Sequence, residues 1–187
     1  MKYTAEEMEK NAVLQVAALM AAAIRTAPKA CRVDTLETII LDGEEKDALA
    51  EKMDAMADEL GLEFFRRDAG NIRQSDCVVL AGARKSYRGL SGCGFCGKEN
   101  CGEAMKDGVS CAYSGVDLGI AIGSAVAIAG EHHIDNRIMF SAGKAAMEMK
   151  MFSKMTSMAF AIPLSVSEKN IYFDRGIASA AQPIFLD

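Results

Sequence analysis

Apolar residues recur at helical spacing through the first third of the chain. Thr4 followed three residues later by Glu7 is a capping box, and the Ala-rich stretch behind it predicts a helix over residues 4–26. This helix is expected to end before Pro28, because the residue before a proline avoids the helical region. Apolar residues at spacings of four, three and four predict a second helix over residues 44–60; they are Leu49, Met53, Met56 and Leu60.

Short apolar runs bounded by turn residues predict three strands, at residues 36–41, 77–81 and 158–162. The polar stretch over residues 66–76 is expected to be a loop. A further helix is expected over residues 143–151. Helices and strands mixed in this order predict an α+β fold.

The stretch Leu118–Gly130 is apolar on all sides, which predicts a helix at the centre of the core. Asp117 is a candidate cap for this helix, and Gly119 and Gly123 are expected to let a neighbouring backbone approach closely. The stretch has 13 residues, short of the roughly 20 that span a bilayer. We therefore expect no membrane partner.

Composition and charge narrow the function classes. The chain has 187 residues, half of them apolar and a quarter charged, which suits a single domain over residues 1–187. Its 21 Lys and Arg against 26 Asp and Glu give a charge of −5, so it lacks the basic surface typical of nucleic-acid binding. Acidic residues precede the first apolar run, whereas a signal peptide needs a basic leader. We expect a soluble cytoplasmic protein without a nucleic-acid partner.

Cysteine is the feature that indicates chemistry. Four of the six cysteines lie within 19 residues with the spacing C-x2-C-x4-C-x9-C; they are Cys93, Cys96, Cys101 and Cys111. Residues 86–115 also hold seven of the 16 glycines, which lets the chain turn sharply around a metal centre. In a reducing compartment such a cluster favours metal ligation over disulfides.

The cysteine spacing favours an iron–sulfur cluster. A structural zinc site usually takes its ligands as two close pairs, but here only Cys93 and Cys96 form one. Zinc at the same four cysteines is the alternative.

The segment GCGFCGKENCGEA (residues 92–104) resembles the start of the four-iron four-sulfur domain of membrane electron-transfer subunits and corrinoid proteins. The resemblance implies a 4Fe-4S cluster held by Cys93, Cys96 and Cys101. The fourth cysteine of that domain lies further downstream than Cys111, so Cys111 and Cys77 both remain candidates for the fourth ligand.

The chain as a whole is similar to a family of uncharacterised prokaryotic proteins that contain a ferredoxin domain. Beside the cysteine segment, the similarity rests on RTAPKA (residues 25–30), on residues 119–146 and on KNIYFDR (residues 169–175). It covers nearly the full length and implies a cluster, with residues 86–115 as an embedded ferredoxin-type segment, but no reaction.

A second resemblance is to the flavin-dependent nitroreductases. Ala27-Pro28, LETIIL, EEKDALAEKM and DLGIA (residues 117–121) follow one another in the order of that family. This implies a mixed sheet flanked by helices, a homodimer, and FMN as a possible cofactor. The chain departs from the family at Arg32 and Asp34, where flavin-contacting Asn and Gln would stand, and it lacks the Arg-rich opening.

A bound flavin phosphate would need cations near the matching motifs, and the candidates are Arg25, Lys29, Arg32, Lys144 and Arg175. Solvated surface charge is the alternative for each. Cys31 lies between Lys29 and Arg32 and is either a reactive thiol or an inert loop residue. His132 and His133 are proton donors, a cluster ligand or part of a polar turn.

These observations favour an iron–sulfur redox protein, which acts in electron transfer to a partner protein or as a flavin-dependent reductase with the cluster as relay. Whether it is an enzyme, an oxidoreductase in that case, stays open, and the substrate is unknown. The alternative is a non-enzymatic regulatory or sensor module that binds zinc or an iron–sulfur cluster.

Overall fold

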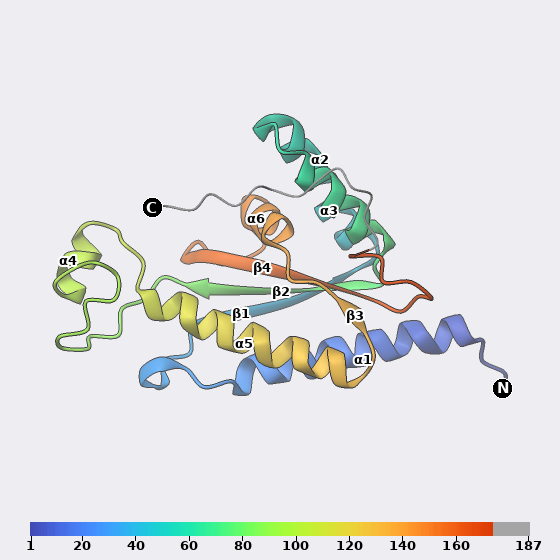
Figure 1. Ribbon diagram of the computed structural model, residues 1–187, viewed down its shortest axis with the longest axis horizontal. Coiled ribbons are helices and arrows are strands. Elements are labelled where there is room, and N and C mark those ends of the chain that lie inside the picture. The colour runs from blue at the N-terminus through green and yellow to red at the C-terminus, as the bar shows by residue number, and fades with distance from the viewer. Residues whose placement is uncertain (174–187) are drawn as a thin grey trace.

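The computed structural model describes residues 1–173 and is built on a four-stranded antiparallel sheet with helices on both faces (Figure 1). The strands follow the order β1-β2-β4-β3 across the sheet. Their bounds are Leu36–Asp42 for β1, Cys77–Arg84 for β2, Asp135–Asn136 for β3 and Thr156–Ser165 for β4.

Two helical layers enclose the sheet (Figure 1). One layer consists of α1 (Ala5–Thr26) and α5 (Ala112–Glu131). The other consists of α2 (Gly43–Leu60), α3 (Glu63–Gln74) and α6 (Phe140–Glu148). A short helix, α4 (Cys101–Lys106), stands outside both layers, and a single 3-10 turn covers Ala30–Arg32. The expected fold class, α+β with a sheet flanked by helices, is confirmed, and the described strands pair antiparallel throughout where a mixed sheet was expected.

Local signals fix several ends of these elements. Thr4 Oγ1 accepts a 3.2 Å hydrogen bond from the Glu7 amide, and the Thr4 amide donates to the Glu7 carboxylate at 2.9 Å. This is the predicted capping box, which satisfies two amides at the start of α1. Gly61 ends α2 in the left-handed conformation, where glycine meets no steric penalty.

Two predictions about helices were wrong. Residues 66–76, expected as a loop, lie mostly in α3. Its buried residues Phe65, Ala69 and Ile72 recur at helical spacing, while the charged residues between them mask the pattern. Asp117 does not cap α5, because the helix begins five residues earlier at Ala112, with Cys111 as its N-cap.

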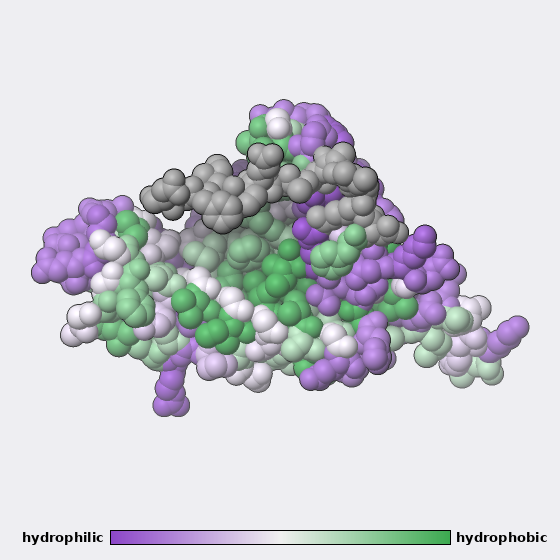
Figure 2. Space-filling model, in the orientation of Figure 1, coloured by the Kyte–Doolittle hydropathy of each residue, from purple (hydrophilic) through white to green (hydrophobic). Residues whose placement is uncertain are grey.

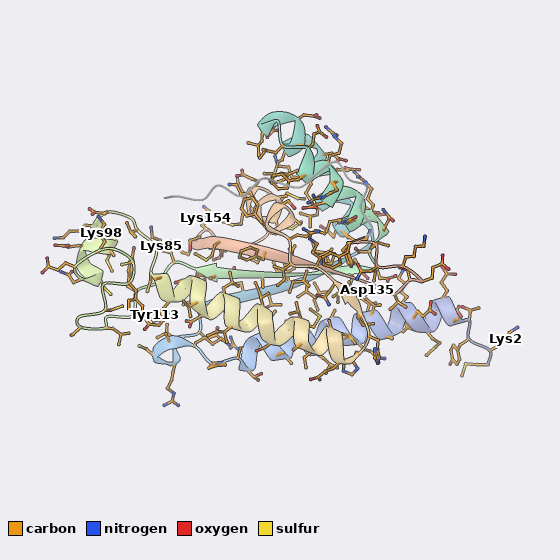
Figure 3. The ribbon with its side chains drawn as sticks, viewed as in Figure 1. Lys2, Lys85, Lys98, Tyr113, Asp135 and Lys154 are labelled. Carbon is orange, nitrogen blue, oxygen red and sulfur yellow. The ribbon has the colours of Figure 1, made fainter. Side chains whose placement is uncertain are left out.

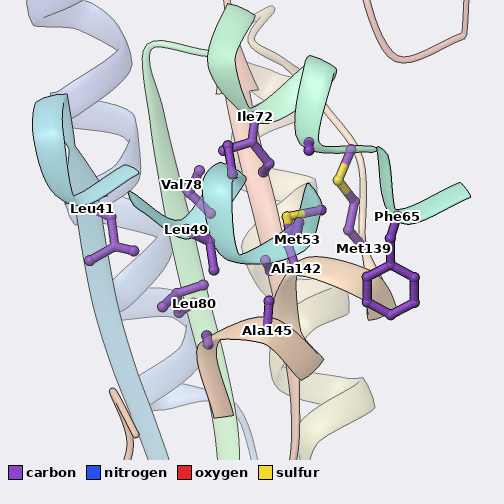
Figure 4. Close-up of a cluster of buried hydrophobic side chains, with 14 of the residues drawn as sticks. Leu41, Leu49, Met53, Phe65, Ile72, Val78, Leu80, Met139, Ala142 and Ala145 are labelled. Carbon is purple, nitrogen blue, oxygen red and sulfur yellow. The ribbon is translucent and has the colours of Figure 1, made fainter. Parts of the chain in front are cut away.

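The hydrophobic core is divided by the sheet. Side chains of β2 alternate, so Val78 and Leu80 pack with α2, α3 and α6, whereas Cys77, Val79 and Ala81 pack with α1 and α5. Figure 4 shows the first of these clusters, in which Leu49, Met53, Phe65 and Ile72 are fully buried. Each such side chain contributes about 1.5–3 kcal/mol by burial. Because β2 supplies side chains to both clusters, it is the strand around which both layers are organised.

The close backbone approach occurs at Gly143 and not at the glycines of α5. A Cβ on Gly143 would lie 2.2 Å from the carbonyl oxygen of Ala159 in β4, a distance that no side chain tolerates. At Gly119 and Gly123 a Cβ would meet no described atom within 4 Å. The expectation for these two glycines was therefore wrong, because both lie on the exposed face of α5, away from its buried residues.

Among the described residues, α5 is the one helix that is long and apolar enough to cross a membrane by length and composition. Seven of its residues are buried against α1 and the sheet, including Leu118, Ala121 and Ala125. The core helix of a soluble protein meets the same length and composition test, so this feature alone does not show that α5 crosses a membrane.

Candidate metal centre

The four clustered cysteines lie in a lobe at one end of the sheet. We call residues 85–111 the cysteine lobe: the chain leaves the end of β2, forms α4, and returns to the start of α5 (Figure 1). Figure 2 shows the outer end of the lobe as hydrophilic and a more apolar surface where it joins the body.

Glycines shape the backbone of the lobe. Five of them adopt a positive φ, which other residues reach only with strain; they are Gly89, Gly92, Gly94, Gly97 and Gly108. Asn100 caps α4 through a 3.1 Å hydrogen bond from the Glu103 amide to its Oδ1. Lys85 Nζ donates to the Gly108 carbonyl and ties the end of the lobe to its beginning.

One cavity brings all four cysteines of the motif together. It is lined by Cys93, Cys96, Cys101 and Cys111 along with the neighbouring residues Tyr87, Arg88 and Phe95. The cavity is narrow, about 20 Å³, so a cluster would need the glycine-rich segment to open around it. In residues 1–173, no three His, Cys, Asp or Glu side chains converge as a single metal ion requires.

Aromatic rings cover this cavity. The rings of Phe95 and Tyr113 stack with their centroids 5.8 Å apart and their planes inclined by 28°. Tyr113 lies in the first turn of α5, where Figure 3 shows it beside the lobe that carries Lys98. Both rings line the cavity, so they restrict access of water to the thiols.

Cys111 occupies a special position because it is the N-cap of α5. The N-terminus of a helix carries a partial positive charge and unpaired backbone amides. The fold thus places the last cysteine of the motif at the start of α5, where it lines the cavity.

A buried ion pair adjoins the cavity, and the sequence analysis missed it. Arg88 Nη2 donates to Asp117 Oδ2 at 2.7 Å, with side-chain exposures of 1% and 2%. Asp117 Oδ1 also accepts a 3.0 Å hydrogen bond from the Ala30 amide. The available signal was an aspartate within an apolar helix, since a buried carboxylate needs a cation.

Cys77 lies far from the cavity. It begins β2 and pairs with Leu164, whereas the cysteine lobe leaves the other end of this strand, about 23 Å away at the usual rise per residue. Burial, together with the nearby Asp76 and Asp42, raises the pKa of the Cys77 thiol to about 12. Of the two candidates for the fourth ligand, only Cys111 lines the cavity.

The flavin-phosphate candidates are not assembled into one site. Arg25 pairs with Asp34 at 2.6 Å, and Lys29 donates to the last carbonyls of α1 at 2.6 and 2.7 Å. Lys144 lies across the sheet in α6 and pairs with Glu148 at 2.7 Å. Arg32 is exposed in the turn after α1, and Arg175 lies outside the described residues.

The two histidines lie apart from the cysteine motif. His132 and His133 follow the far end of α5, about 30 Å along the helix from Cys111. They lie in a turn before β3, as one of the three interpretations expected. Cys31 is exposed in the turn after α1, with a φ of 55°.

Nitroreductases are among the solved structures with a similar fold. Nitroreductase CinD from Lactococcus lactis, in complex with nicotinic acid, matches with a TM-score of 0.61 at 15% identity, over 93% of this chain and 84% of that one. An FMN-dependent nitroreductase from Clostridium difficile matches with a TM-score of 0.54 at 15% identity, over 83% of this chain and 76% of that one. At such identities the likeness shows a nitroreductase-like fold.

Sequence comparison assigns the family. Residues 107–175 match the model described as "Uncharacterized protein containing a ferredoxin domain (DUF2148)". An uncharacterized protein of Archaeoglobus fulgidus is 41% identical over 175 residues, which is 89% of this chain and 94% of that protein. The chain belongs to this family of ferredoxin-domain proteins, and family and fold together indicate a redox role.

Proposed function

We propose that this protein is an electron-transfer protein in which Cys93, Cys96, Cys101 and Cys111 hold a 4Fe-4S cluster. The observation that carries the proposal is the single cavity lined by all four cysteines of the motif. In this proposal residues 86–115 are the electron-transfer segment of a single domain over residues 1–187.

The donor set fits the cluster. Four thiols from one glycine-rich segment are the ligands that iron–sulfur centres use. Bound there, the cluster supplies one-electron transfer. In this proposal the four cysteines hold the cluster, and Phe95 and Tyr113 restrict solvent access to it.

Zinc fits the same thiols less well. A mononuclear zinc site needs four sulfurs at about 2.3 Å from one ion. Such a site usually takes its ligands as two close pairs, whereas in this lobe only Cys93 and Cys96 form one. A regulatory module with zinc in the lobe therefore stays the second candidate.

A flavin is not supported by the described residues of one chain. Three of the cations expected to hold its phosphate have other partners, namely Arg25 with Asp34, Lys29 with helix carbonyls, and Lys144 with Glu148, and Arg32 is exposed in the turn after α1. The proposed electron transfer therefore does not use FMN.

In this proposal the electron partner is another redox protein. We also propose that the chain assembles as a homodimer, and light scattering tests this by measuring the mass of the particle in solution.

The test is metal analysis of protein purified without oxygen. We expect a brown protein with a broad visible absorption band, and iron and sulfide in equal number. Serine at Cys93, Cys96, Cys101 or Cys111 should lower the iron content and bleach the band. A colourless protein with one zinc per chain would refute electron transfer and favour the regulatory module.

Cys31 and Cys77 provide matched controls. Cys31→Ser and Cys77→Ala each remove a thiol outside the cavity, so iron and absorbance should stay at the wild-type level. Loss of iron in Cys77→Ala together with normal iron in Cys111→Ser would assign the fourth ligand to Cys77 and contradict the proposed set.

A further inference from the structure

Arg88 carries a buried N–H group without a partner at the edge of the cysteine cavity. Its Nη2 donates to Asp117 and its Nη1 donates to Ser86 Oγ. The side chain is only 1% exposed, and its Nε is buried without a hydrogen-bond partner among residues 1–173. Arg88 also lines the cavity of the four cysteines.

Such an unpartnered donor indicates that an acceptor is to be supplied. Buried polar groups in proteins almost always have hydrogen-bond partners, because burial without one is costly. The acceptors that a bound cluster would supply in this cavity are the deprotonated cysteine sulfurs and the inorganic sulfides. Arg88 is the one cation with a fully buried side chain among the residues that line it.

We propose that Arg88 sets the reduction potential of the cluster by donating its Nε–H to a cluster or ligand sulfur. The inference rests on the proposed function and goes beyond it by assigning a tuning residue. Net charge and hydrogen bonds to sulfur are two of the factors that fix the potential of an iron–sulfur cluster. Reduction adds one electron from the redox partner, and no bond or proton at Arg88 changes.

The two charges of the ion pair lie at different distances from the cavity. Asp117 does not line the cavity, and the Ala30 amide holds its second oxygen from the side of α1. The cation is therefore nearer to the cluster than the anion that balances it. A nearby positive charge favours the reduced cluster, which carries one more negative charge, so Arg88 raises the potential and Asp117 moderates that effect.

Potentiometric titration of three variants tests this assignment. Asp117→Asn leaves the guanidinium without its counter-charge, so the potential should rise. The double variant Arg88→Met with Asp117→Asn leaves no buried charge unpaired and should lower the equilibrium constant for reduction about tenfold, or about 59 mV for one electron. Arg88→Lys keeps the charge but loses Nε–H, so its potential should lie between wild type and the double variant.

A second ion pair provides the control. Arg67 Nη2 lies 2.8 Å from Asp68 in α3, which contributes no residue to the cysteine cavity, so Arg67→Met with Asp68→Asn should lower stability without moving the potential. Variants with full iron and unchanged potentials would overturn the tuning role alone. A folded Arg88→Lys protein without iron would also overturn it, since all four thiols remain. A wild-type protein without iron would instead overturn the proposed function, and this inference with it.

Discussion

The ring of Phe95 stacks on the ring of Tyr113 at a centroid distance of 5.8 Å, and both residues line the cysteine cavity. Phe95 comes from the lobe and is 71% exposed, so it covers the cavity from the solvent side. Phe95→Ala should admit water and oxygen and speed the loss of visible absorbance in air several-fold. Phe140→Ala removes a similarly exposed ring from α6 and should leave the decay rate unchanged. Equal rates in all three proteins would contradict a shielding role.

The contact between α6 and β4 predicts a strong effect of a single methyl group. Gly143→Ala would place a Cβ 2.2 Å from the Ala159 carbonyl oxygen, and both partners are backbone, so neither yields easily. We expect the free energy of unfolding to fall by about 1–3 kcal/mol, measured by urea denaturation. Gly70→Ala in α3 meets no described atom within 4 Å and should raise stability by about 0.4–1 kcal/mol.

Two buried acids predict a loss of stability at alkaline pH. Burial raises the pKa of Cys77 from 9.0 to about 12 and that of Tyr172 from 10.0 to about 12. Above pH 9 the unfolded chain thus binds fewer protons than the folded chain, so stability is full below pH 9 and falls between pH 9 and 12. Urea midpoints should drop between about pH 8 and about pH 10.5.

Cys77→Ala isolates the contribution of the thiol. The variant should be less stable than wild type at both pH values, because it leaves a small cavity in the core. Its drop between the two values should nevertheless be smaller, since of the two groups with a raised pKa only Tyr172 then remains. An unchanged drop would exclude Cys77 as a cause.

Metal removal should loosen the lobe and spare the sheet. From residue 89 to residue 111, only Ala104 and Cys111 are buried apolar residues, so little hydrophobic contact holds the lobe without a cluster. After chelation, amide hydrogen exchange should speed up across the lobe while the amides of β2 and β4 stay protected. Equal protection with and without iron would show that the lobe is held by the polypeptide alone.

Local sequence signals were sufficient for much of the fold. The capping box at Thr4 and the turn at Gly61 fixed one end each of α1 and α2, because caps act through neighbours in the chain. Strand β1 was predicted to within a residue, from a run of apolar residues. Helix α3 was missed because its buried residues, such as Phe65 and Ile72, stand between charges that form surface ion pairs.

The motif by itself indicated a candidate centre with Cys93, Cys96 and Cys101, since C-x2-C-x4-C-x9-C on a glycine-rich segment is a local pattern, and it left Cys111 and Cys77 as alternatives for the fourth ligand. Only the tertiary structure separated Cys77 from that centre, placed Cys111 at the start of α5, and brought Arg88 against Asp117, 29 residues away. Which charges meet in a core depends on how helices and strands pack. That packing is decided by long-range burial and hydrogen bonding, which no window of the sequence contains.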